Sequence, residues 1–165
     1  GPYKGNKGEF TEGGIRIPCI LSAPGLVPQN VTSDHVVCGL DWLPTVLSLS
    51  GIAHEPEKAF DGSDLSVALE ADGSAPDERT LHFQWYDDWA VMQGDWKLIG
   101  SNAAPNRMLV NVCDENPEAA DYLLPLWSNA EHLRRSQDLE MKHDRWMADV
   151  RSGYEDENDP ERDRE

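Results

Sequence analysis

The alternation of apolar and polar residues in the second half of the chain constrains its fold most strongly. Every second residue of 81–85 is apolar, which is the period of a strand with one buried face. The runs 90–93 and 96–99 are separated only by residues 94–95, a Gly-Asp pair suited to a tight hairpin turn. With a further strand expected at 109–112, the pattern predicts a small antiparallel sheet of four strands.

A helix is expected to follow this sheet and to pack on it. Ser128 and Glu131 have the spacing of a capping box, and apolar residues recur at helical intervals through 139–150. His143 lies on this apolar stripe, where a packing histidine is favoured over a metal ligand. From Ser152 onward, charged residues without apolar anchors predict a disordered tail.

The first part of the chain has the pattern of α/β packing. A glycine-rich loop is expected to enter a buried strand at 15–21, and a second short strand is expected at 35–37. Asp41 can begin a helix that ends at Gly51 and packs through an apolar face. That face comprises Leu43, Val46, Leu47 and Ser50. The order strand, helix, strand favours an α/β layer.

A connector rich in Gly, Asp and Pro at 72–77 divides the chain. We therefore predict an α/β part at 1–72, an antiparallel subdomain at 73–151 and a disordered acidic tail at 152–165.

Charge and cysteine content exclude several classes of function. Thirty-one acidic residues against fourteen basic ones give a net charge of −17, which repels nucleic acid and anionic membranes. Three widely spaced cysteines suggest neither a zinc site nor a disulfide framework. The excess of acidic residues is interpreted as belonging to a solvated surface.

The segment 5–18 carries the chemistry that the sequence offers. Lys7 stands among glycines, which let the backbone approach an oxyanion closely, and its ammonium group can contact one anion oxygen. On these grounds phosphate and sulfate fit equally well, and a solvent-exposed lysine without function is the alternative. The segment is not a P-loop, because the GxxxxGK[ST] motif does not occur.

A series of motifs in a fixed order resembles the type I, arylsulfatase-like sulfatases of the alkaline-phosphatase-like superfamily. Lys7-Gly8 followed by Glu12-Gly13-Gly14 resembles the lysine segment of that family. Further stretches match family patterns in the same order, at 23–25, 40–45, 60–65, 90–97 and 114–118. Collinear matches over residues 1–150 are far more specific than one short motif.

The resemblance implies a fold and a role for the lysine. The chain would form the C-terminal end of an alkaline-phosphatase-like α/β domain, followed by a small antiparallel four-stranded sheet with a packed C-terminal helix. Lys7 would contact the sulfate ester and offset charge that develops on its oxygens. Glu12, Gly13, Gly14 and Arg16 would shape the loop rather than take part in catalysis.

The resemblance also implies groups that this chain lacks. Family members use a formylglycine made in a C/S-x-P-x-R motif and a calcium ion held by acidic residues of several loops. No cysteine here is followed by Pro at the right spacing, and Ser74 lacks the final Arg. The late metal-ligand pair of the family would precede Gly1, so no metal ligand is assigned. We expect a C-terminal fragment that is inactive alone.

The residues of the first subdomain strand and its following loop are expected to reach the substrate. Tyr86, Asp87 and Trp89 are the predicted substrate-binding residues, with Trp85 and Asp88 beside them. Aromatic faces and carboxylates suit a sugar, so a sulfated carbohydrate is the expected substrate. The alternative is that Trp85 and Trp89 simply pack the sheet.

Other functions remain open from the sequence. A phosphonate or phosphodiester hydrolase of the same superfamily could carry the same scaffold, and a noncatalytic glycan-binding module or a purely structural remnant could carry the same aromatic loop. Family members are commonly exported, and Asn30 begins a glycosylation sequon, so export is expected.

Overall fold

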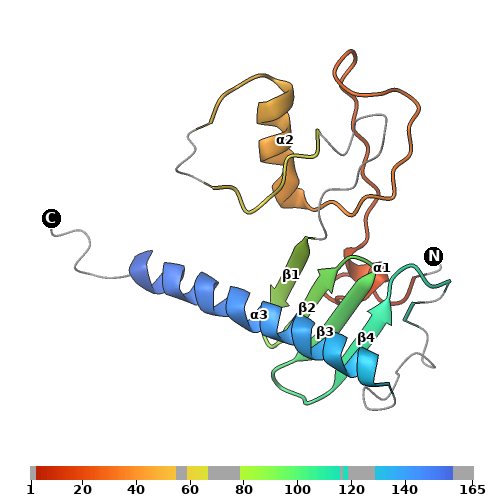
Figure 1. The fold of residues 1–165 in the computed structure, drawn as a ribbon, viewed down its shortest axis with the longest axis vertical. Helices are drawn as coiled ribbons and strands as arrows, with labels where there is room; N and C mark the ends of the chain where they lie inside the picture. The colour runs from red at the N-terminus through yellow and green to blue at the C-terminus, as the bar shows by residue number, and fades with distance from the viewer. Residues whose placement is uncertain (1–2, 55–58, 67–78, 116, 119–128, 158–165) are drawn as a thin grey trace, which may run out of the picture. The chain divides into compact units, whose positions relative to one another are not determined.

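The computed structural model describes residues 3–54, 59–66, 79–115, 117–118 and 129–157 (Figure 1). It divides into two compact units, one formed by Gly1–Ile17 with Arg79–Glu165 and the other by Pro18–Glu78. We call them the sheet unit and the α2 unit. No helix in the described ranges is long and apolar enough to span a bilayer.

The sheet unit is built on the predicted four-stranded antiparallel sheet, which is confirmed. Its strands follow chain order, β1 (Thr80–Trp85), β2 (Asp88–Gln93), β3 (Trp96–Ser101) and β4 (Arg107–Asn111). Gly94 has a φ of 54°, which glycine adopts without a Cβ penalty, and the turn it begins pairs Gln93 with Trp96. The predicted hairpin at 94–95 is therefore confirmed.

Helix α3 (Ala130–Glu157) packs on one face of this sheet (Figure 1). The core between them consists of Trp89, Val91, Leu98, Leu109 and Leu139. Asn129 accepts a 2.8 Å hydrogen bond from the Glu131 amide at the helix start, whereas Ser128 of the predicted capping box lies outside the described residues. Residues 152–157 continue α3, so the prediction of a disordered tail from residue 152 is wrong there, and 158–165 lie outside the described ranges.

The N-terminal segment packs on the other face of the sheet. Successive strand residues point to opposite faces, so Lys97 faces away from its neighbour Leu98 and from α3. The Lys97 ammonium contacts Glu12 of the short helix α1 (Glu12–Ile15). The rings of Phe10 and Phe83 add a tilted contact, with centroids 6.2 Å apart. Residues 3–17 thus group with the subdomain rather than with 18–72, and the predicted boundary at 72 falls outside the described residues.

The α2 unit holds a 3-10 turn, η1 (Gly39–Asp41), and the helix α2 (Trp42–Leu49) that Asp41 was predicted to begin. Helix α2 buries Pro44 and Thr45, while Leu43 and Val46 of the predicted apolar face are exposed. The prediction that Leu43 and Val46 lie on a buried face of the helix is therefore wrong within this unit.

The strands predicted at 15–21 and 35–37 do not form in this structure. Ile15 ends α1, and Ile20 is 89% exposed. A strand is stabilised by pairing with a neighbour, and no other described segment pairs with either stretch. The α/β class stands nonetheless, because the described chain combines a four-stranded sheet with helices.

Candidate functional site

Lys7 lies at an exposed turn of the N-terminal segment. The Glu9 amide donates to the Asn6 carbonyl at 3.1 Å, and the Asn6 side chain donates to the Glu9 carboxylate at 3.1 Å. Gly5 and Gly8 on either side have φ values of 90° and 98°, which few other residues adopt. No described side chain pairs with the Lys7 ammonium, so it is available to an anion from solvent.

Two glycines at the base of this loop are required by close backbone packing. A Cβ on Gly13 would lie 2.5 Å from the Lys4 carbonyl oxygen, and one on Gly14 would lie 2.0 Å from that of Glu9. The Gly13 amide also donates to the Lys4 carbonyl at 2.8 Å, which closes the loop. These contacts support the loop-shaping role expected for the Glu-Gly-Gly motif.

A buried charge network joins the lysine loop to the sheet. The fully buried Lys97 ammonium lies 2.6 Å from Oε1 of Glu12 and 2.7 Å from Oε1 of Glu118. Both Glu118 oxygens accept the Glu12 backbone amide, at 2.9 and 2.8 Å. Arg16 adds a 3.4 Å contact to the outer oxygen of Glu12. A charge-assisted hydrogen bond in a buried site is strong, so the network holds the loop base in one position.

Sequence reasoning missed Lys97 and Glu118 as partners of the loop. Each is the charged residue of a family-like motif, Gly-Asp-Trp-Lys for Lys97 and Pro-Glu for Glu118. The available signal was a charged residue, Lys97, between the apolar Trp96 and Leu98 of a predicted strand. Nothing in the spacing indicated that they meet, because Glu12 and Glu118 are 106 residues apart.

Tyr86 and Asp87 form the turn between β1 and β2 and are exposed. Tyr86 is 85% exposed with a φ of 52°, and its ring contacts the half-exposed Trp85 edge-on at 5.1 Å. The Asp87 carbonyl accepts the Asn102 amide at 2.7 Å, which ties this turn to the loop after β3. The two predicted residues and Trp85 thus form an accessible aromatic tip.

Trp89, the third predicted substrate-binding residue, is only 2% exposed. Its ring stacks on His143 at 4.7 Å, and the Arg107 guanidinium lies 4.8 Å from its centroid. The alternative of packing is therefore right for Trp89 and wrong for Trp85, which is exposed. His143 is a packing histidine as predicted, with its Nε2 3.2 Å from Oε1 of Gln84.

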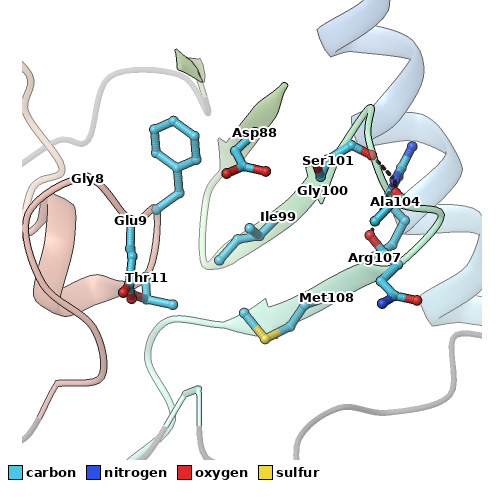
Figure 2. A pocket seen from close by; sticks show the side chains of 12 residues that line it. Gly8, Glu9, Thr11, Asp88, Ile99, Gly100, Ser101, Ala104, Arg107 and Met108 are labelled. Carbon is cyan, nitrogen blue, oxygen red and sulfur yellow. Dashed lines mark hydrogen bonds between the residues drawn. The ribbon is translucent and has the colours of Figure 1, made fainter. Parts of the chain in front are cut away.

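A pocket of about 340 Å³ lies between the lysine loop and the edge of the sheet where β2 begins and β3 ends (Figure 2). Its lining includes Gly8 and Glu9 from the loop, with Asp88, Ile99 and Met108 from the strands. Tyr86 and Asp87 do not line it. The structure therefore brings Asp88, rather than Asp87, beside the residues that follow Lys7.

Burial lowers the pKa of two histidines between α3 and the sheet. Burial first, and then the nearby His143, lower the pKa of His82 to about 4, and burial also lowers the pKa of His143. Both rings are therefore neutral near pH 7. Within the described ranges, no three His, Cys, Asp or Glu side chains gather in a way that could hold a metal ion.

Comparisons with known proteins agree with the resemblance seen in the sequence. No protein-family model matches the chain. It is 47% identical to mouse arylsulfatase G over 58 residues and 36% identical to human steryl-sulfatase over 81 residues. These alignments cover 35% and 49% of this chain but only 11% and 14% of those proteins.

A solved structure shares the fold over most of the chain. Ps i-CgsB, solved in complex with k-i-k-neocarrahexaose, matches with a TM-score of 0.71 and 24% identity. The match covers 88% of this chain and 32% of that protein.

Proposed function

Because this chain is a relative of the sulfatases, we propose that the complete protein hydrolyses sulfate esters and that this chain supplies Lys7 as a contact to the sulfate. The single observation that carries the proposal is the exposed Lys7, which pairs with no described side chain, in a sulfatase-like motif whose base is ion-paired with the sheet. An ammonium on a mobile loop would contribute less, because catalysis depends on donors already in place.

The role proposed for Lys7 is electrostatic. Its ammonium is a compact charge that can bind one sulfate oxygen and stabilise the negative charge that grows on the ester during cleavage. The network of Glu12, Lys97 and Glu118 would act through Lys7 by fixing where the loop begins. We therefore assign Lys97 and Glu118 as positioning residues, not catalytic ones.

The nucleophile and the metal are proposed to come from outside this chain. The sequence has no formylglycine motif, and the described acidic residues do not form a calcium site. Calcium and formylglycine, when present in the complete enzyme, would supply the Lewis acid and the nucleophile. We expect the isolated chain, mixed with an aryl sulfate and calcium, to show no turnover above the blank. Clear turnover would contradict the proposal that the nucleophile and the metal site come from outside this chain.

A sulfated carbohydrate is the substrate class we propose. The support is the exposed aromatic tip of Trp85 and Tyr86 with the Asp87 carboxylate beside it, groups that suit a sugar face and its hydroxyls. Ps i-CgsB, which shares the fold, was solved with an oligosaccharide.

The proposal is tested by the Lys7→Ala variant of the complete protein, with Lys4→Ala as the matched control. Lys4 lies in the same exposed loop, and among the described residues its contact is made by the backbone carbonyl, which alanine retains. We expect kcat for an aryl sulfate to fall by about 10²-fold or more in Lys7→Ala, the effect of losing one transition-state donor. Lys4→Ala should keep kcat within about twofold of that of the unsubstituted protein.

Two outcomes would replace the proposal. Faster turnover of an aryl phosphonate or phosphodiester than of the sulfate would indicate the phosphoryl-transfer alternative. Binding of a sulfated sugar without hydrolysis, unchanged by Lys7→Ala, would indicate a glycan-binding module.

Export is proposed on the family resemblance, and the exposed Asn30 of the sequon is compatible with it. Expression of the complete protein through a eukaryotic secretory pathway, followed by a mass measurement before and after glycosidase treatment, tests whether Asn30 is modified.

A further inference from the structure

The pocket beside the lysine loop has the chemistry of a sugar site. We propose that it binds the uncharged ring that carries the sulfate ester, with Asp88 as the hydroxyl acceptor. This rests on the proposed function, because it assumes that the sulfate lies at Lys7.

The charged side chains that line the pocket argue against binding of the sulfate group inside it. Glu9 and Asp88 are acidic, and Arg107 is the one cationic residue of the lining. The Arg107 guanidinium is already used, donating to Glu140 at 2.9 and 2.8 Å and to backbone carbonyls, and Figure 2 shows it turned toward α3. An anion entering the pocket would therefore meet two carboxylates and no available cation.

Asp88 is the group best placed to bind hydroxyls. The Glu9 carboxylate already accepts from Asn6 and Thr11, whereas no hydrogen bond or ion pair joins the Asp88 carboxylate to another described residue. Its side chain lies across the pocket from Glu9 (Figure 2). A carboxylate with free lone pairs accepts sugar hydroxyls without needing a positive ligand.

The remaining lining suits the rest of a sugar ring. Phe10, Ile99 and Met108 give an apolar wall for the C–H face, and Ser101 and Asn106 offer polar groups at the other side. The volume of about 340 Å³ is at the small end for ligand pockets, which fits one ring rather than a long chain.

The position of the pocket connects it to Lys7. Gly8 lines the pocket and directly follows Lys7, so the two backbone positions are about 3.8 Å apart. The Lys7 ammonium, at the end of a four-carbon side chain, would then bind an ester group that projects from the ring on the Gly8 side of the pocket. The pocket would then select the sugar, while Lys7 binds its sulfate.

The test is an amide NMR titration of the 165-residue chain with methyl β-D-galactopyranoside, and with sodium sulfate in parallel. We expect the glycoside to shift the amides of Gly8, Asp88 and Ser101, and sulfate to leave Asp88 and Ser101 unshifted. Asp88→Asn should weaken glycoside binding by about fivefold or more, since it removes a charged acceptor. Ala104→Trp, which fills the pocket from a loop, should abolish it.

The matched control is Asp149→Asn, an equal charge change at an exposed residue of α3. Shifts confined to Tyr86 and Asp87, no shifts at all, or binding unaffected by Asp88→Asn and Ala104→Trp would overturn the proposal. Amide spectra of each variant show whether it is folded.

A second readout separates this inference from the proposed function. In the complete protein, Asp88→Asn should raise KM for a sulfated galactoside and leave KM for 4-nitrophenyl sulfate, which has no sugar, unchanged. Equal changes for both substrates would contradict the pocket assignment. Absence of any sulfate hydrolysis would instead defeat the proposed function, while the titration still decides whether the pocket binds a sugar.

Discussion

In the sheet unit two buried carboxylates hold an ammonium group, whereas in the α2 unit one buried carboxylate holds backbone amides. Lys97 lies between Glu12 and Glu118. Asp41, which is fully buried, accepts the Cys38 amide at 2.7 Å and the Ser63 amide at 2.9 Å. Both arrangements hold a motif-bearing loop in place, the first through ion pairs of Lys97 and the second through hydrogen bonds that Asp41 accepts from backbone amides.

The two arrangements differ in how far apart in sequence their partners lie. Lys97 and Glu12 are 85 residues apart, while Asp41 and Ser63 are 22 apart. Thr45, one turn after Asp41, accepts the Leu65 amide at 2.9 Å and strengthens the same local connection. The Asp41 bonds connect neighbouring parts of one short stretch of chain, whereas the lysine loop is held to a distant strand by strong charge-assisted bonds. Buried charges are costly to leave unpaired, so the two anchors should respond very differently to substitution.

Lys97→Met is expected to have the largest effect. It removes the buried ammonium that lies between Glu12 and Glu118, while Glu12 keeps its 3.4 Å contact to Arg16, and this should lower the free energy of unfolding by about 3–5 kcal/mol. Urea unfolding followed by tryptophan fluorescence measures it. The control is Lys142→Met, which breaks an exposed 2.6 Å pair with Asp138 and should cost about 0–1 kcal/mol. Equal losses in both variants would show that the network does not anchor the unit.

The anchor of the α2 unit should be second in size. Asp41→Asn keeps one acceptor oxygen but turns an NH₂ group toward the other amide, which should cost about 1.5–3 kcal/mol. Hydrogen exchange at the Ser63 amide should speed up, while exchange at the Gly13 amide of the sheet unit stays unchanged. Asp34→Asn, at an exposed aspartate, is the control. Faster exchange at both amides would mean that the two anchors are not independent.

The glycines of both anchors should give a smaller, matched pair of effects. A Cβ on Gly14 would meet the Glu9 carbonyl oxygen at 2.0 Å, and one on Gly62 would meet that of Leu40 at 2.1 Å. Gly14→Ala and Gly62→Ala should each cost about 1–3 kcal/mol in denaturant unfolding, because the backbone must shift. Gly39→Ala has open space around the new atom and should change stability by less than about 0.5 kcal/mol. A cost at Gly39 equal to the others would refute the packing explanation.

A last expected effect is a pH dependence of the stability of the sheet unit. The pKa of His82 falls from its ordinary 6.5 to about 4 on folding, so the unfolded chain binds a proton over a range where the folded chain does not. The contribution of His82 to stability is therefore present above pH 6.5 and is lost as the pH falls from 6.5 toward 4. His82→Phe, which retains a ring against Trp146, should flatten this slope in urea unfolding between those values. If the pH dependence of the free energy of unfolding is unchanged in His82→Phe, a group other than His82 causes it.

The sequence predicted the local elements well because their causes are local. The alternation of 81–85, the Gly94 turn and the Asp41 helix start each depend on neighbouring residues, and each is present. The strand expected at 15–21 depends on a pairing partner that the described chain does not provide.

The residues of the candidate site could be chosen from the sequence, but their geometry could not. Lys7 could be chosen from its motif, and Tyr86 and Asp87 are exposed as a binding role requires. Trp89 was misassigned because a tryptophan suits a sugar platform and a core equally well, and only its place in the strand alternation against α3 decides. The meeting of Glu12 with Lys97 and Glu118 depends on the sheet register, which no single motif contains.

The central claim is that the buried network serves catalysis through Lys7, and kcat of Glu118→Gln in two backgrounds of the complete protein tests it most directly. In protein with Lys7, Glu118→Gln should lower kcat for an aryl sulfate by roughly tenfold, because it loosens the loop that places the ammonium. In the Lys7→Ala background the same substitution should cause no further loss, since the two changes act through one group. An equal loss in both backgrounds would show that Glu118 supports the fold generally and that Lys7 is not what the network positions.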